Sequence, residues 1–161
     1  MHASIENCIL FKGLTEVQIN ELLFSVDYKE KTYSKGDLIV QSDAEVRSLL
    51  IVVGGSVRGE MVDFSGKTIK IEDIESPRML APAFLFGKNN RFPVDIVANE
   101  ECVILTISKD SFLKLLQENI QVLSNYLNSI SNRAQFLSNK IKVMQSPTDL
   151  FHIQKPRMNG F

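Results

Sequence analysis

Few side chains in this 161-residue chain have the types and spacing that catalysis or metal binding requires. The two cysteines, Cys8 and Cys102, are too few for a disulfide framework or a cysteine-bound cluster, so we expect both to be buried as small apolar side chains. The two histidines, His2 and His152, lie near opposite ends of the chain. The sequence contains no serine, histidine and aspartate set and no glycine-rich phosphate loop. These residues predict a protein that is not an enzyme and that holds no metal or other cofactor.

The first two thirds of the chain read as one helix followed by many short strands. Residues 14–26 repeat apolar side chains near the helical period, and Thr15 is a suitable N-cap. From residue 27 to residue 107, short apolar or β-branched runs alternate with turn residues, which predicts about eight strands. The clearest runs are residues 38–40, 49–53, 57–62, 68–74, 94–98 and 102–107. The turns include Gly54-Gly55, where we expect positive φ at both glycines, and residues 63–66. This spacing predicts a sandwich or jelly roll.

Two helices are expected after the strands. Ser108 is a suitable N-cap for a short helix, and a second, longer helix follows over residues 119–144. The longer helix would measure about 39 Å and carries apolar residues at alternating steps of three and four. These seam residues are Ile120, Leu123, Leu127, Ile130, Ala134, Leu137, Ile141 and Met144. Serine, asparagine and glutamine flank the seam, so the apolar stripe is narrower than a helix packed on its own sheet usually carries. We therefore expect this helix to pair with a second copy, and packing on the chain's own sheet is the alternative.

Charge and hydropathy divide the chain into two unlike parts. Residues 1–118 hold 13 lysines and arginines against 18 acidic residues, whereas residues 119–161 hold five against one. The basic excess is small, and we interpret it as solvated surface. No apolar run reaches membrane-spanning length and residues 1–12 do not resemble a signal peptide, so we expect a cytoplasmic protein without membrane contact. Pro147 is expected to end the long helix.

The predicted fold class is α+β, mainly β: a double-stranded β-helix (jelly-roll) roll with a flanking N-terminal helix and a long C-terminal dimerisation helix. Several short motifs punctuate these elements in a fixed order: residues 10–14, residues 35–39, Gly55-Ser56-Val57, Gly66-Lys67, Val97-Ala98 and Ile107-Ser108. Over about residues 9–144, this order resembles the cyclic-nucleotide-binding-type sensor domain of the Crp/Fnr transcription regulators. The resemblance implies a sensor domain at 1–118 and a coiled-coil dimerisation helix at 119–144. It also implies a tail, or the start of a missing helix-turn-helix DNA-binding domain, at 145–161.

The chain departs from this family where the nucleotide would bind. In cyclic-nucleotide-binding members, a Gly-Glu pair cradles the phosphate and ribose, and an arginine further along neutralises the phosphate. Here Ala81 and Pro82 occupy the Gly-Glu positions, and Phe92-Pro93 stands where the arginine is usual. Pro82 offers neither a carboxylate nor a backbone donor, and Phe92 cannot pair with an anion. Losing such a charge-assisted contact removes about 1.5–3 kcal/mol, so we expect no cyclic AMP or cyclic GMP in the usual mode.

The resemblance implies a degenerate effector pocket at this place. Its residues are Leu80, Ala81, Pro82, Ala83, Phe84, Arg91, Phe92 and Pro93, with Leu137 and Ser138 facing it from the long helix. Leu85 and Phe86 would line the same pocket. Arg78 and Arg91 are the candidates to reach an anion, although strand alternation directs Arg91 away from the face of Phe92. Either an apolar or weakly polar effector binds here, or these side chains fill the space themselves.

The sequence therefore leaves three functions to be compared. The first is the effector-sensing and dimerisation module of a Crp/Fnr-type transcription regulator, which pairs as a homodimer and reaches DNA only through a domain absent from this chain. The second is a structural dimerisation domain with a filled pocket and no effector. The third and remote one is a cupin-like enzyme, but a cupin places histidines inside its barrel and residues 27–107 contain none. Iron–sulfur and haem sensing are unsupported as well, because Cys8 stands alone and no internal cysteine or histidine ligand lies near the middle strands.

Overall fold

A computed structural model describes residues 3–144 of the chain. The described α-helices are α1 (Glu16–Phe24), α2 (Lys109–Glu118) and α3 (Ile120–Met144). The described strands are β1 (Tyr28–Tyr33), β2 (Leu38–Val40), β3 (Ser48–Gly54), β4 (Ser56–Val62), β5 (Thr68–Glu75), β6 (Arg78–Leu80), β7 (Asp95–Ala98) and β8 (Cys102–Ser108). Three 3-10 helices complete this part: η1 (Ala3–Asn7), η2 (Ile9–Phe11) and η3 (Pro82–Phe84). Two compact units divide within α3, the first ending at Leu127 and the second beginning at Asn128.

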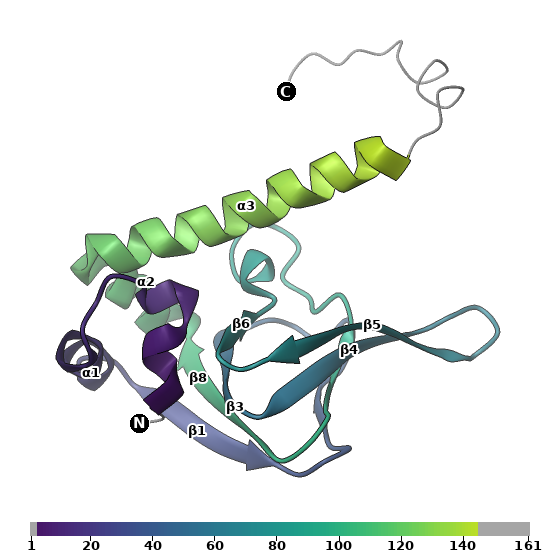
Figure 1. Ribbon diagram of the computed structural model, residues 1–161, viewed down its shortest axis with the longest axis horizontal. Helices are drawn as coiled ribbons and strands as arrows, with labels where there is room; N and C mark the ends of the chain where they lie inside the picture. Colours follow the sequence, from purple (N-terminus) through teal and green to yellow (C-terminus); the bar gives the residue numbers. More distant parts are fainter. Residues whose placement is uncertain (1–2, 145–161) are drawn as a thin grey trace. The chain divides into compact units, whose positions relative to one another are not determined.

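The first unit is built on two antiparallel sheets that form a roll (Figure 1). One sheet has the strand order β1-β8-β3-β6 and the other has the order β2-β7-β4-β5. Alternate side chains of both sheets meet between them in one apolar cluster, which we call the roll interior. Its buried members are Val52, Val57, Ile74, Leu80, Ile96, Ala98, Cys102 and Ile104, with Tyr33, Ile39, Val40, Leu50 and Val94 partly buried against them. The predicted mainly β, jelly-roll class is confirmed.

Local capping explains where the helices begin and end. The Thr15 hydroxyl accepts a hydrogen bond from the backbone N–H of Gln18, whose side chain accepts one from the Thr15 N–H, so α1 starts with a full capping box. The Ser108 hydroxyl caps α2 by accepting from the Ser111 N–H. Asn119 leaves the helical region, which ends α2, and its side-chain oxygen accepts from the Val122 N–H, which starts α3. The predicted helices are thus present, with α1 two residues shorter at each end than the range 14–26.

The first turns of α3 pack on the N-terminal segment. Asn125 is buried, and its side-chain amide donates to the backbone carbonyls of Leu10 (2.9 Å) and Lys12 (2.8 Å). The remaining oxygen of Asn125 accepts from the Gln121 side chain at 3.0 Å. This buried amide therefore has its donors and its acceptor paired, which makes the contact stabilising.

The hairpin of β4 and β5 extends past the rest of the roll (Figure 1). Gly59 pairs with Glu72 and Glu60 pairs with Lys70, so Ile71 is an extra, bulged residue. At the far turn, the Asp63 carboxylate accepts hydrogen bonds from the backbone of residues 65 and 67 and from the side chain of residue 65, which lowers the pKa of Asp63.

The turn between β3 and β4 differs in one detail from the prediction. Gly55 takes a positive φ of 76°, but Gly54 does not. The expectation for Gly54 is wrong because this residue is still paired with Val103 in the β3–β8 ladder and keeps strand geometry.

Candidate functional site

The loop that follows β6 occupies the predicted effector position. Leu80 ends β6 inside the roll interior, Ala81 takes a left-handed conformation with φ of 47°, and Pro82 opens the short helix η3. A left-handed alanine is strained, so the chain makes an abrupt turn here that the surrounding contacts must hold. Leu80 and Leu85 are buried, whereas Ala81, Pro82 and Phe84 are half-buried. Of the predicted pocket residues, Ala83 is exposed.

Two side chains, one from α3 and one from the segment that follows η3, donate hydrogen bonds to carbonyl groups of this loop. The Tyr126 hydroxyl of α3 donates to the Pro82 carbonyl at 2.6 Å. The Asn90 amide donates to the carbonyls of Phe84 (3.1 Å) and Leu85 (3.3 Å). Burial raises the pKa of Tyr126 to about 12, so its hydroxyl stays protonated and remains a donor at neutral pH. Hydrogen bonds to three backbone carbonyls therefore fix the conformation of the loop.

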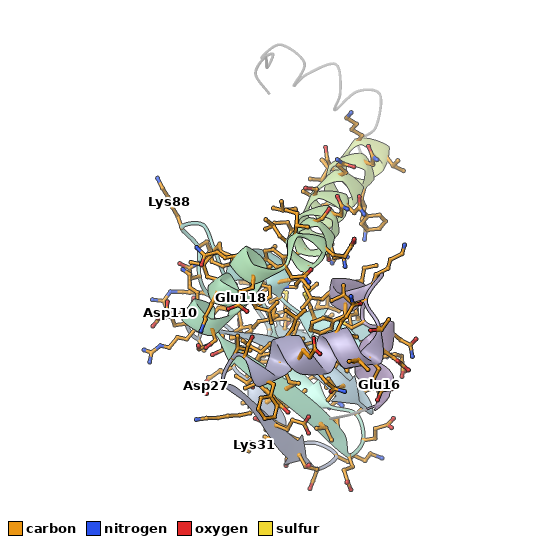
Figure 2. The ribbon with its side chains drawn as sticks, turned by 90° about the vertical axis from the view of Figure 1, so that its left-hand side faces the viewer. Glu16, Asp27, Lys31, Lys88, Asp110 and Glu118 are labelled. Carbon is orange, nitrogen blue, oxygen red and sulfur yellow. The ribbon has the colours of Figure 1, made fainter. Side chains whose placement is uncertain are left out.

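Three aromatic rings pack together next to this loop. Phe86, Phe112 of α2 and Tyr126 pack ring against ring, with the centroids of Phe112 and Tyr126 5.0 Å apart and those of Phe86 and Tyr126 6.1 Å apart. The ammonium of Lys109 lies 5.1 Å from the centroid of Phe86. Phe86 therefore packs in this aromatic group. Lys88, at the tip of the loop, points away from the fold (Figure 2).

The contacts of Tyr126 and Asn90 with this loop were not predicted from the sequence. Val122 and Tyr126 are spaced by four residues and both are buried, so they form a second apolar stripe beside the predicted seam. That spacing was a usable signal for a helix face that packs on the chain's own roll. Asn90 carries no comparable signal, because its partners are backbone carbonyls five and six residues away in an irregular loop.

The two cysteines lie in the core, as predicted. Both are buried and unpaired, and burial is the main cause that raises the pKa of each thiol. A protonated, buried thiol is a poor nucleophile and a poor metal ligand. Within residues 3–144, no group of three or more histidine, cysteine and acidic side chains is placed to hold a metal ion. In the same range, no helix is both long and apolar enough to cross a bilayer.

A family model described as the cyclic nucleotide-binding domain matches residues 30–119, which include all eight described strands except the first two residues of β1. The chain belongs to the cyclic nucleotide-binding domain family. A solved transcriptional regulator from Thermotoga maritima is 30% identical, with a TM-score of 0.71, over 85% of this chain and 98% of that one. The match places the domain in a regulator of the Crp/Fnr type.

Two further solved structures share the fold of this cyclic nucleotide-binding domain. The sensor domain of the transcriptional regulator DNR from Pseudomonas aeruginosa is 20% identical, with a TM-score of 0.68, over 89% of this chain and 92% of that one. The catabolite activator protein of Thermus thermophilus is 17% identical with a TM-score of 0.74; 84% of this chain is covered but only 62% of that one. Among curated proteins, no sequence match is found. The family and these structures are regulators rather than enzymes, in agreement with the prediction for this chain.

An aromatic side chain lies in the core at Phe92, the residue predicted to stand in place of the usual arginine. Phe92 is only 6% exposed, and its backbone N–H donates to the Ala44 carbonyl at 3.0 Å. The neighbouring Arg91 is exposed, and its guanidinium donates to the Asp43 carbonyl at 2.8 Å. Arg91 and Phe92 thus lie on opposite sides of the backbone, and Pro93 after them is exposed. Leu137 and Ser138 belong to the second unit, so their predicted approach to this loop stays a prediction.

Proposed function

We propose that this chain is the effector-sensing and dimerisation module of a Crp/Fnr-type transcription regulator, and that it does not hold cyclic AMP or cyclic GMP in the usual mode. In this proposal residues 1–118 sense, residues 119–144 pair two copies, and contact with DNA is made outside these two parts. The regulator class follows from the family, and the missing nucleotide grip and the pairing helix are the new elements.

The backbone of Pro82 is the main support for the proposal that cyclic nucleotides do not bind in the usual mode. Pro82 has no N–H to offer a phosphate, and its carbonyl already accepts the Tyr126 hydroxyl at 2.6 Å. The side chain of Phe92 is apolar and buried, so the position at which the resemblance leads one to expect an arginine supplies no positive charge. A phosphodiester seated on this loop would lie against apolar side chains with its charge unpaired, which costs more than the lost contact alone.

Thermal unfolding in the presence of cyclic AMP or cyclic GMP tests this element. A ligand that binds only the native state raises the Tm. We expect neither nucleotide to bind, so the Tm should change by less than about 1 °C at a millimolar concentration of either one. A reproducible rise of several degrees with cyclic AMP would show that the loop accepts the nucleotide despite Pro82 and Phe92.

The second element, pairing through α3, is supported by the apolar side chains that this helix leaves exposed. Seam residues Ile120, Leu127, Leu137 and Ile141 are all exposed, and Ile141 keeps 60% of its surface accessible. A repeat of this kind buries its seam when two helices pair, and each leucine or isoleucine then contributes about 1.5–3 kcal/mol. Val122 and Tyr126, which lie outside the seam, are the apolar residues at the start of this helix that are fully buried.

Light scattering after gel filtration tests the pairing. We expect the unchanged protein to run as a dimer and the variant Ile130→Asp to run as a monomer, because it places a charge in the seam. The matched control is Asn132→Asp, which adds the same charge at an exposed position outside the seam. Equal masses for all three proteins would contradict pairing through this helix.

A structural dimerisation domain without an effector is the second candidate. It is favoured by the burial of Leu80, Leu85 and Phe92, which pack into the fold instead of lining an open site. The same thermal measurement separates the two candidates when it is extended to a panel of small metabolites. A compound that raises the Tm supports sensing, and a panel without any such compound supports the structural role.

A further inference from the structure

The outward side of α1 carries apolar side chains that remain exposed to solvent. Val17 and Phe24 lie seven residues apart, which places both on one face of the helix. Val17 keeps 66% and Phe24 keeps 93% of its surface accessible. Ile19 and Leu23, on the other side of the helix, are buried. Helix α1 is therefore apolar on two sides, and only one of them is buried in the fold.

A shallow groove with mainly apolar walls lies beside Phe24. It is lined by Asn20, Glu21, Phe24 and Ser25, so it follows the outward side of α1 to the end of the helix. The Ser25 hydroxyl lies 3.1 Å from a carboxylate oxygen of Glu118, which brings the end of α2 next to the groove. An apolar side chain from a partner would meet the exposed ring of Phe24 here. We call the groove together with Val17 the α1 surface.

Carboxylates surround the α1 surface. Glu16 begins α1, Glu21 lies in the groove, Asp27 follows the helix and Glu118 ends α2. In Figure 2 this side faces the viewer, with Glu16 at one end of α1, Asp27 beyond the other end and Glu118 above the helix. Within residues 3–144, none of these four carboxylates forms a salt bridge. Residues 13–28 also contain no lysine or arginine. The surface is therefore apolar at its centre and negative around it.

We propose that the α1 surface binds a basic amphipathic helix of another protein. Such a helix repeats apolar side chains at steps of three and four and carries lysine or arginine around them. One of its apolar side chains can enter the groove and pack on Phe24, while its basic side chains meet the surrounding carboxylates. An aromatic side chain at the centre of an interface, with polar residues around it, often supplies much of the binding energy.

The charges of the α1 surface argue against other occupants. A second copy docking through the same surface would bring its four carboxylates against the same four, because a two-fold contact is self-complementary. Nucleic acids and anionic lipids carry negative phosphates, which these carboxylates repel. Lys31 of β1, also labelled on this side in Figure 2, has its ammonium 4.9 Å from the ring centroid of Tyr33. A positively charged partner is therefore the one that this surface favours.

Fluorescence anisotropy with a labelled peptide tests the docking. The probe is a peptide of about 16 residues in which leucines recur at steps of three and four and most other positions are lysine. We expect a dissociation constant of about 10–100 μM, weakening severalfold between about 50 and 500 mM NaCl as the charges are screened. A peptide with the same residues in shuffled order and a peptide with glutamate in place of lysine should each bind at least about tenfold more weakly. Probe binding weaker than about 1 mM, or equal binding of the glutamate peptide, would overturn the proposal.

Variants locate the bound peptide. We expect Phe24→Ala to weaken probe binding at least about tenfold, because it removes the ring at the centre of the surface. Glu21→Lys should weaken it about three- to tenfold by repulsion. The matched controls are Phe64→Ala, at a fully exposed phenylalanine of the β4–β5 turn, and Glu101→Lys, at an exposed glutamate before β8. Equal affinities of Phe24→Ala and Phe64→Ala would overturn the site. If Phe24→Ala does not fold, Glu21→Lys against Glu101→Lys decides the question.

Light scattering and competition identify the other occupants. If Phe24→Ala lowers the mass of the protein in solution and Phe64→Ala does not, the surface pairs two copies, and the proposal is overturned. The proposal is also overturned if an unlabelled peptide of residues 145–161 displaces the probe at a lower concentration than the unlabelled probe does. Neither measurement involves cyclic nucleotides, so the proposed sensing function is tested separately.

Discussion

The hydrogen bond between Tyr126 and Pro82 can be removed with one atom. In Tyr126→Phe the ring keeps its packing against Phe86 and Phe112, but the 2.6 Å bond to the Pro82 carbonyl is lost. Tyr126 is only 3% exposed, so water replaces the missing donor poorly. We expect a loss of about 1–2 kcal/mol in the free energy of unfolding. For a chain of this length, that corresponds to a fall of about 3–6 °C in Tm.

The burial of Tyr126 also predicts a pH dependence. Burial raises the pKa of Tyr126 from its ordinary value of 10.0 to about 12 in the native protein, whereas the unfolded chain keeps the ordinary value. The protonated form is therefore favoured by folding, and its contribution is fully present below pH 10 and is lost as the pH rises toward 12. A difference of two pKa units corresponds to about 2–3 kcal/mol. The stability advantage of the unchanged protein over Tyr126→Phe should therefore shrink steadily above pH 10.

Urea unfolding followed by far-UV circular dichroism measures both effects, since the chain has no tryptophan to report by fluorescence. The protein concentration is held constant, because pairing would add to the apparent stability. Tyr28→Phe is the control, because Tyr28 lies on β1 with its side chain partly exposed. The reasoning is refuted if Tyr126→Phe unfolds within 0.5 kcal/mol of the unchanged protein, taking about 0.5 as the scatter of surface substitutions. A difference that stays constant from pH 8 to pH 11.5 would refute the pH argument.

Three further substitutions test the fold that positions the site. Gly55→Ala should cost more than about 2 kcal/mol, because Gly55 has positive φ and a Cβ there would collide with the Glu101 carbonyl; Gly66→Ala, also at positive φ but in open space, should cost about 1 kcal/mol. Equal losses in urea unfolding would show that strain alone decides. Asn125→Ala should cost about 2–3 kcal/mol, because two N-terminal carbonyls lose their donors, and should speed proteolysis of the first dozen residues. Unchanged proteolysis would contradict this attachment.

The strands that the sequence predicts well are those with an apolar face and clear turns. The ranges 49–53, 57–62 and 102–107 lie inside β3, β4 and β8, because their side chains alternate into the roll interior and glycine or acidic turns end them. β1 was not predicted as a separate strand. All of its residues but the last are exposed and three are charged, so no face carries an apolar signal. It is an edge strand whose pairing with β8 depends on contacts distant in sequence.

The candidate site was only partly predictable for the same reason. The lack of charge at Pro82 and Phe92 can be read directly from residue types. The contacts that hold the loop cannot, because Tyr126 lies 44 residues from its partner. The alternation of β5 could not be predicted either, because the bulge at Ile71 shifts it and has no distinctive residue pattern.

Helix α3 carries two stripes of side chains, and in the proposed dimer this division would connect a change in the Pro82 loop to the pairing of the helices. Asn125 bonds the N-terminal segment and Tyr126 bonds the Pro82 loop, whereas Leu123 and Leu127 belong to the predicted seam. Leu127 directly follows Tyr126 on the same rigid helix. A ligand that displaces Pro82 would therefore either break the hydrogen bond from Tyr126 or move Tyr126 and rotate the helix. A rotation of the helix would also turn Leu127. In the pairing that we propose, seam residues pack only in register, so a small rotation at this end would change the pairing free energy.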